Sequence, residues 1–196
     1  MTISCVVLAA GTSSRLGSPK QLLDLDGKPV LQHVLEAAAA AACEEIVLVL
    51  GHEAERITAA VDLPGRSRIV LNEHFAEGQS TSLLAGLEAV DATAEAALIV
   101  LGDQPRVPAS AYRAVLSSWD GDADVVRPLY DGVPGHPVLI ARRAFGNFDN
   151  LTGDTGARAI TDRPGVDILE VNLPGPAPVD IDTGEDYEAL RRSGDG

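Results

Sequence analysis

A run of small residues with two cations lies near the start of the chain and has the composition of a phosphate-binding loop. It covers residues 8–20, reads LAAGTSSRLGSPK, and directly follows an apolar stretch typical of a buried strand. Small residues let backbone N–H groups approach a phosphate, and Arg15 and Lys20 add positive charge. The spacing is neither that of a Walker A loop nor that of a dinucleotide fingerprint. A plain strand-to-helix connector is the alternative, but two cations in one loop of an acidic chain favour phosphate binding.

Two aspartates follow apolar segments and have the chemistry of metal ligands. Asp103 comes after the apolar run 98–101, so we expect it at the carboxyl edge of a sheet, where ligands bind in open α/β folds. Asp182 follows the run 179–181, which predicts a second strand end. Because Mg²⁺ takes one or two protein carboxylates and completes its shell with phosphate oxygens and water, this pair predicts a magnesium site.

Other roles for these carboxylates remain open in the sequence. Asp180 could replace Asp182, because neighbouring strand positions point to opposite faces. Asp103 could be a turn residue, and Asp182 could be the N-cap of the last helix, with Thr183 as a rival for that cap.

Three further polar segments could contact substrates. The segment 78–82, GQSTS, precedes a helical pattern, and its Ser80, Thr81 and Ser82 are good helix caps. The exposed N–H groups at the helix start could also read a base, and the two roles can coexist. The segment 153–158, GDTGAR, leads into a short predicted helix whose N-terminus could bind an anion, while Arg158 could grip phosphate in a bidentate manner or form a surface ion pair. His136, in Gly-His-Pro, is by itself more typical of a structural histidine.

Strand-like apolar runs alternate with helical patterns in the elements that must position these residues. Strands are expected at 3–9, 46–51, 69–71 and 96–101, and helices at 30–42, 53–61, 81–90 and 108–118. Continuous apolar strands between helices indicate a mostly parallel sheet covered on both faces. The predicted fold class is therefore α/β, a three-layer sandwich related to the dinucleotide-binding fold.

The pattern changes after residue 122. Strands at 125–130 and 137–141 flank Asp131-Gly132 and predict a hairpin-like excursion. A helix at 156–162, a strand at 166–171, a loop at 173–178 and a last helix near 185–191 follow. We predict one domain over residues 1–196. Residues 1–120 carry the candidate phosphate-binding loop, and residues from about 121 to 196 form a lid or substrate-binding insertion on the same sheet, which returns the second candidate metal ligand.

Composition limits the partners and the compartment. A net charge of −14 argues against nucleic acid, because binding to a phosphate backbone needs a basic surface. No apolar segment approaches the roughly 20 residues of a membrane helix, and the N-terminus lacks the basic start of a signal peptide, so we expect a cytoplasmic protein without membrane contact. Cys5 and Cys43 are expected to be free thiols.

Six motifs in the order of the chain resemble one known family. The segment 8–20 is similar to the LAAGxSxRxGxxK signature of the nucleotidyltransferases that include molybdenum-cofactor nucleotidyltransferases, methylerythritol-phosphate cytidylyltransferase and sugar-nucleotide pyrophosphorylases. The MobA-like branch, and within it the molybdenum cofactor cytidylyltransferases, is the most similar. The resemblance covers nearly the whole chain and rests on residues 8–20, 78–83, 102–105, 135–137, 153–158 and 180–183.

This resemblance implies a nucleotide-diphospho-sugar-transferase-like fold and the transfer of CMP from CTP to molybdenum cofactor (molybdopterin), with Mg²⁺ as cofactor and pyrophosphate as product. A molybdoenzyme or its chaperone would be a further partner. The implied nucleotide-binding residues are Leu8, Ala9, Ala10, Gly11 and Ser82, of which Ser82 would contact cytosine. The implied catalytic residues are Arg15, Lys20 and Asp103, the metal ligands Asp103 and Asp182, and the acceptor-binding residues His136, Asp154 and Arg158.

Three alternatives accompany this prediction. The chain could use GTP or another phosphorylated acceptor, although LAAG rather than LAGG, together with Ser82, favours CTP. It also resembles MobA-like oxidoreductases that act on the quinonoid dye nicotine blue with a nicotinamide cofactor. The third alternative is a non-catalytic chaperone that binds molybdenum cofactor and delivers it to a molybdoenzyme. The presence of Arg15, Lys20 and Asp103 together argues against this alternative.

Overall fold

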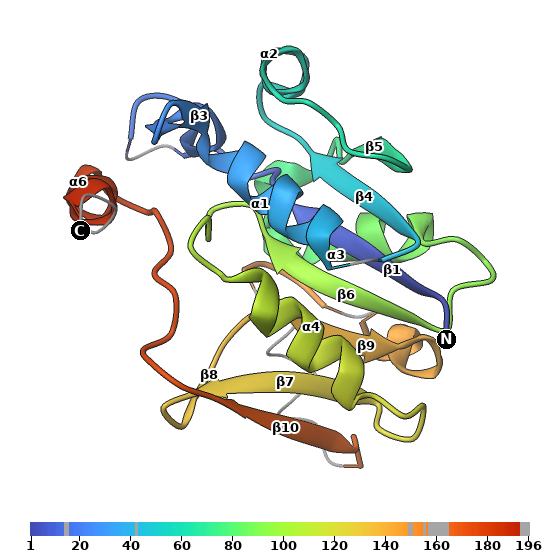
Figure 1. The fold of residues 1–196 in the computed structure, drawn as a ribbon. Helices are drawn as coiled ribbons and strands as arrows, with labels where there is room; N and C mark the ends of the chain where they lie inside the picture. The colour runs from blue at the N-terminus through green and yellow to red at the C-terminus, as the bar shows by residue number, and fades with distance from the viewer. Residues whose placement is uncertain (14–15, 42, 149–150, 155, 157–164, 193–196) are drawn as a thin grey trace.

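A single eight-stranded sheet crosses the molecule (Figure 1). The computed structural model describes residues 1–196 except 14–15, 42, 149–150, 155, 157–164 and 193–196. The strands follow the order β10-β7-β9-β6-β1-β4-β5, and β8 pairs with β7 beside this path. Their bounds are β1 Ile3–Leu8, β4 Glu45–Leu50, β5 Ser67–Leu71, β6 Ala96–Leu101, β7 Val125–Tyr130, β8 Val133–Pro134, β9 Val138–Ala141 and β10 Ile168–Leu173.

The parallel part of the sheet is built around β1. This strand pairs in parallel with β4 on one side and with β6 on the other. All six of its residues are buried, because its side chains alternate between two cores: Cys5 and Val7 pack on one face of the sheet, and Val6 and Leu8 on the other. Burial on both faces explains why β1, β4 and β6 are almost entirely apolar; the buried Ser4 of β1 donates a hydrogen bond to the Glu45 carboxylate of β4 at 2.7 Å. The strand β9 lies antiparallel to both β6 and β7.

Helices cover both faces of the sheet and complete the three layers. The core on one face is formed with α1 (Val30–Ala40), α2 (Ala54–Ala60) and α4 (Ala109–Ser118). The other core is formed with α3 (Gln79–Ala89) and the 3₁₀ segment η3 (Arg142–Phe148). In Figure 1, α1 and α4 lie in front of the sheet and α3 lies behind it. The predicted α/β sandwich with a mostly parallel sheet is thus confirmed.

A third, smaller core joins the two ends of the chain. It contains Leu25 of β2 (Asp24–Leu25), which pairs with β3 (Lys28–Pro29), and Leu190 of α6 (Gly184–Arg192). Ile181 is buried in the same core. The C-terminal segment therefore lies against the segment that follows the Gly-rich loop.

Two element predictions were wrong, both near the C-terminus. The last strand is Ile168–Leu173 rather than 166–171, because its register is set by pairing with β7 from Ile168↔Val125 to Leu173↔Tyr130. The run 179–181 is not a strand. Its Ile181 instead packs into the third core, and its backbone N–H donates to the carbonyl of Asp103 at 3.3 Å. The predicted helix 156–162 lies mostly outside the described residues.

The predicted turn at Asp131-Gly132 is present, with both residues in the left-handed region at φ 46° and 84°. This geometry joins β7 to β8 as a two-residue hairpin. The strand expected at 137–141 is β9, which begins at Val138, and the strand that returns directly from this turn is the unpredicted β8 of two residues. Strands from both halves of the chain share one sheet, and the functional division near residue 120 stays a prediction.

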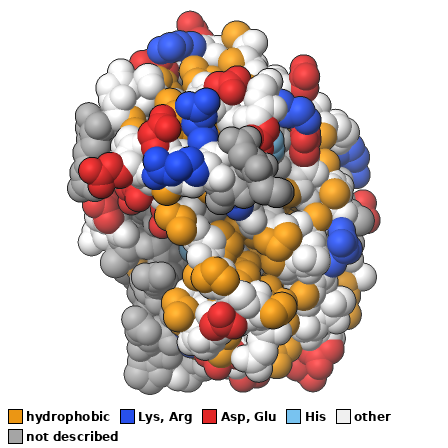
Figure 2. Space-filling model, turned by 60° about the vertical axis from the view of Figure 1, so that its left-hand side comes forward, with side chains coloured by type: hydrophobic (Ala, Val, Ile, Leu, Met, Phe, Trp, Pro, Cys, Tyr) orange, Lys and Arg blue, Asp and Glu red, His pale blue; other side chains and the backbone are white. Residues whose placement is uncertain are grey.

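Three composition-based expectations can be compared with the structure. Cys5 and Cys43 are free thiols, as expected. No helix within the described residues is long and apolar enough to cross a bilayer. On the face shown in Figure 2, the Lys and Arg side chains of the described residues lie among Asp and Glu side chains and form no continuous basic surface.

Candidate functional site

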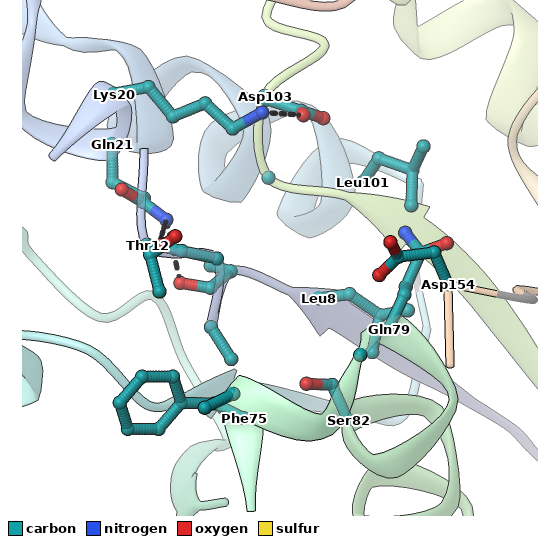
Figure 3. A pocket seen from close by; sticks show the side chains of 16 residues that line it. Leu8, Thr12, Lys20, Gln21, Phe75, Gln79, Ser82, Leu101, Asp103 and Asp154 are labelled. Atoms are coloured by element: carbon teal, nitrogen blue, oxygen red, sulfur yellow. Dashed lines mark hydrogen bonds and ion pairs between the residues drawn. The ribbon is translucent and has the colours of Figure 1, made fainter. Parts of the chain in front are cut away.

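A cavity of about 270 Å³ lies at the carboxyl ends of β1 and β6 (Figure 3). The loop after β1, the start of the 3₁₀ segment η1 (Lys20–Leu22), the start of α3 and the turn after β6 all contribute to its walls. Eight residues predicted from the sequence line it: Leu8, Ala9, Ala10, Gly11, Lys20, Ser82, Asp103 and Asp154. His136 and Asp182 are not among the lining residues, although Asp182 contacts the lining residue Lys20, and Arg15 and Arg158 lie outside the described residues.

The Gly-rich loop is held in place by side chains and by close backbone contacts. The amide of Gln21 donates to the carbonyls of Ala9 at 2.8 Å and Gly11 at 3.4 Å. The backbone N–H of Gly102 donates to the carbonyl of Leu8 at 2.8 Å. A Cβ at Gly102 would lie 2.8 Å from the Cβ of Ala9, so this glycine lets the end of β6 approach the loop.

Lys20 joins the two predicted metal ligands. Its Nζ lies 2.5 Å from Oδ2 of Asp103 and 3.0 Å from Oδ1 of Asp182. The Lys20 side chain is only 14% exposed and that of Asp103 18%, whereas that of Asp182 is 55% exposed. Figure 3 shows the Lys20 side chain extended towards the Asp103 carboxylate. Two segments about 80 residues apart in sequence thus place carboxylates around one ammonium group.

The charges at this point influence each other. Burial by itself would lower the pKa of Lys20, but the attraction of Asp103 and Asp182 outweighs it, and the pKa lies above its ordinary value. Burial raises the pKa of Asp103, and the neighbouring Lys20 offsets this only in part. The Lys20 ammonium therefore stays protonated, and a nearby cation stabilises the ionised carboxylate of Asp103.

The structure distinguishes Asp180 from Asp182. Asp180 accepts a hydrogen bond from the Gln104 amide at 2.5 Å, whereas Asp182 faces Lys20. Thr183 caps α6, because its hydroxyl accepts from the Asp186 N–H at 3.2 Å and its own N–H donates to the Asp186 carboxylate at 2.8 Å. The cap is therefore Thr183, and the Asp182 side chain is left to face Lys20.

These two carboxylates fit a divalent cation that is shared with phosphate. The described residues contain no group of three or more His, Cys, Asp or Glu side chains that could hold a metal ion alone. Mg²⁺ needs only one or two protein carboxylates when phosphate oxygens and water fill its other positions. The ammonium of Lys20 already lies between the two carboxylates and balances part of their charge. Because a metal ion would have to compete with this ammonium and would need further ligands, it would bind together with a phosphorylated ligand.

The first turn of α3 forms another wall and is capped by backbone alone. No side chain of the described residues caps the helix, so the capping role weighed for Ser80, Thr81 and Ser82 was wrong. The Ser80 N–H instead donates to the carbonyl of Gly153 at 3.1 Å. This contact brings the 151–154 loop against the helix and places Asp154 at the cavity.

The MobA-like NTP transferase domain family matches residues 5–168, a span that includes all of these cavity walls. The chain belongs to this family. Family membership supports nucleotidyl transfer from a nucleoside triphosphate as the reaction class of this chain.

Relatives of this MobA-like NTP transferase carry more than one activity. The molybdenum cofactor cytidylyltransferase of Escherichia coli (strain K12) is 28% identical over 188 residues, covering 94% of this chain and 93% of that protein. The nicotine blue oxidoreductase of Paenarthrobacter nicotinovorans is 31% identical over 209 residues, covering 97% and 94%. The crystal structure of Rv0371c from Mycobacterium tuberculosis H37Rv in complex with manganese is 32% identical with a TM-score of 0.84, covering 98% of this chain and 100% of that one.

Some residues of the cavity carried no clear signal in the sequence. Phe75, in the 3₁₀ segment η2 (Phe75–Glu77), lines the cavity but belongs to none of the three hydrophobic cores. It fits against Gly51, where a Cβ would lie 2.5 Å from the Phe75 Cβ, and its ring centroid lies 5.9 Å from that of His52. Gln21 was also missed, although an amide in an otherwise apolar stretch, QLL, could have drawn attention to it.

Gly78→Ala is expected to destabilise the protein by about 1–3 kcal/mol. Gly78 has φ 120°, and a Cβ there would overlap the backbone of Gly153. The 151–154 loop would have to separate from α3. Thermal unfolding and limited proteolysis measure both effects. Gly121→Ala is the matched control, since Gly121 has φ 101° but no atom within 4 Å of its Cβ position. Equal destabilisation by the two variants would mean that the loop contact contributes nothing.

Proposed function

We propose that this chain transfers CMP from CTP to a phosphorylated acceptor of the molybdopterin type and releases pyrophosphate. The observation that carries the proposal is the meeting of Lys20, Asp103 and Asp182 beside a cavity that the Gly-rich loop lines together with Lys20 and Asp103. Nucleotidyl transfer follows from the family; the base and the acceptor are the proposed part.

The reaction is an exchange of phosphate bonds. An oxygen of the acceptor's terminal phosphate attacks the α-phosphorus of CTP, the new P–O bond forms, and the bond from the α-phosphorus to the oxygen that bridges to the β-phosphate breaks. Pyrophosphate leaves with that oxygen and its electron pair. Phosphate is already an anionic nucleophile at neutral pH, so positioning and charge neutralisation dominate catalysis.

Each wall of the cavity has a part in this scheme. The backbone of Leu8 to Gly11 would hold the triphosphate, and Lys20, with Arg15, would neutralise the charge that develops on the leaving pyrophosphate. Asp103 and Asp182 would hold Mg²⁺, which lowers the electrostatic cost of bringing two phosphate anions together. Lys20 bonds to both carboxylates, so a cation that replaces it there would free its ammonium for the phosphates.

The opposite end of the cavity suits a base. Ser82 and Phe75 lie there, away from Lys20 and Asp103 (Figure 3). Ala10, the second alanine of LAAG, and Ser82 support CTP, as does the similarity to the E. coli cytidylyltransferase. Asp154, which belongs to the 151–154 loop, lines the cavity and supports an acceptor site beside this loop. His136 and Arg158 would extend that acceptor site.

Cytidylyl product should exceed guanylyl product by about tenfold or more when CTP and GTP compete at equal concentration. The expectation rests on Ser82 and the LAAG loop. The measurement uses α-labelled nucleotides, molybdopterin as acceptor and Mg²⁺, with separation of the dinucleotide products. Predominant guanylyl product would refute the base assignment and leave the reaction class intact.

The nicotine blue oxidoreductase relative makes redox chemistry the second candidate function. It predicts that the wild-type chain oxidises NADPH in the presence of a quinonoid dye and releases no pyrophosphate from CTP. Following NADPH absorbance and pyrophosphate release on one preparation separates the two functions.

A further inference from the structure

Asn72 lies beneath the first turn of α3 and has a fixed amide orientation. The residue follows β5 and is only 5% exposed. Its Oδ1 accepts a hydrogen bond from the backbone N–H of His74 at 3.0 Å. Because only the carbonyl oxygen of an amide can accept from an N–H, this bond assigns the two ends of the side chain and turns Nδ2 towards the helix.

The two protons of Nδ2 are donated to two neighbouring hydroxyls. Asn72 donates to Oγ1 of Thr81 at 2.9 Å and to Oγ of Ser82 at 3.0 Å. Thr81 in turn donates to a backbone carbonyl, that of Gly78 at 2.9 Å or that of His74 at 3.0 Å. One lone pair and the proton of the Thr81 hydroxyl are therefore in use.

The Ser82 hydroxyl is in a different situation. It accepts from Asn72, and no described residue accepts its own proton. Ser82 lines the cavity at the end that is remote from Lys20 (Figure 3). Its oxygen already receives a proton from Asn72, so the Ser82 hydroxyl can turn its own proton towards a ligand.

We propose that Asn72 is a positioning residue that fixes Ser82 as a hydrogen-bond donor, so that the cavity selects a base with an acceptor at the edge facing Ser82. Cytosine offers two adjacent acceptors, N3 and O2, on its pairing edge, whereas guanine presents N1–H and N2–H₂ donors and a single acceptor, O6. The inference rests on the proposed function and specifies its base selectivity.

The isosteric variant Asn72→Asp inverts this polarity. A carboxylate keeps the acceptor for the His74 N–H but has no proton for Ser82, so the Ser82 hydroxyl would donate to it and turn lone pairs to the cavity. The backbone is anchored independently, because the N–H of Asn72 donates to the carbonyl of Leu50 at 2.8 Å. Asn72→Ala removes the hydrogen-bond donor without adding a buried charge. It is the variant to measure if Asn72→Asp fails to fold.

Calorimetric titration with Mg²⁺ tests the proposal on the full chain. The ligands are CTP and inorganic tripolyphosphate, which has no base. We expect Asn72→Asp to weaken CTP binding about tenfold, and Asn72→Ala somewhat less, while tripolyphosphate binding changes by less than about twofold. A merely structural role for Asn72 would weaken both ligands together and would follow the melting temperature.

A double-mutant cycle with Ser82→Ala completes the test. If Asn72 acts through Ser82, Asn72→Asp with Ser82→Ala binds CTP no more weakly than Ser82→Ala alone. Additive losses, or CTP binding that both Asn72 variants leave intact, would overturn the role of Asn72 while leaving the proposed function in place. A wild-type chain that bound tripolyphosphate but not CTP would overturn the proposed base and this inference with it.

Discussion

Asp103→Asn is expected to lower nucleotidyl transfer by about 10²–10³-fold while the protein stays folded. The substitution removes one of the two carboxylates that meet at Lys20, and with it the negative charge that would attract a divalent cation. The fold at this point depends on backbone bonds, from Gly102 to Leu8 and from Ile181 to Asp103, which the amide leaves unchanged. Pyrophosphate release with CTP and Mg²⁺, together with circular dichroism, measures the two effects.

Asp180→Asn is the matched control for this variant. It makes the same change of charge and size, but Asp180 bonds to Gln104 rather than to Lys20. We expect its transfer rate to remain close to that of the wild-type chain. Normal turnover by Asp103→Asn would remove this carboxylate from the mechanism, and equal losses in both variants would indicate that only the total negative charge matters.

The parallel strands could be predicted from the sequence because their burial is a local property of each segment. The run 96–101 is apolar throughout, both of its faces are covered, and the structure places β6 at the same residues. The bounds of strands at the edge of the sheet, such as β10, depend instead on the strands with which they pair. The register of β10 follows from β7, with which it pairs along its whole length, and no pattern within 166–173 contains that information.

The misassigned run 179–181 shows the same limit on a smaller scale. An apolar side chain between two aspartates has the alternation of an exposed strand. Ile181 is buried by Leu25, Val30 and Leu190 instead, and these residues come from both ends of the chain. Asp180 and Asp182 therefore reach the cavity region from an irregular segment that is anchored by one buried residue and one backbone bond to Asp103.

The candidate site was predictable where a charge or a glycine stands out, and not where a role arises from contact. Lys20 and Asp103 are prominent in the sequence, and the structure brings them together. Asn72 follows a strand and reads as an ordinary turn residue; only the fold places its amide beneath Ser82. Phe75 likewise shows no periodic pattern, and its position at the cavity depends on the missing side chain of Gly51.

Lys20→Met is expected to reduce transfer about a hundredfold, which corresponds to roughly 3 kcal/mol in the barrier. Methionine keeps an apolar stem of similar length and removes only the ammonium, which lies between Asp103 and Asp182. The variant should also lose about 1–3 kcal/mol of unfolding free energy, because Asp103 would remain largely buried without its cation. Pyrophosphate release and denaturant unfolding measure the two losses separately.

Lys28→Met provides the comparison, since the chain has only these two lysines. Lys28 forms an exposed ion pair with Glu36 at 2.8 Å, and such surface pairs contribute about 0–1 kcal/mol. We expect this variant to retain both transfer and stability.

If the Lys20 ammonium only balances the charge of Asp103, adding Mg²⁺ should restore the stability of Lys20→Met and its turnover together. If it also acts on the phosphates, Mg²⁺ should restore stability but not turnover. Restored turnover at saturating Mg²⁺ would limit Lys20 to a structural role.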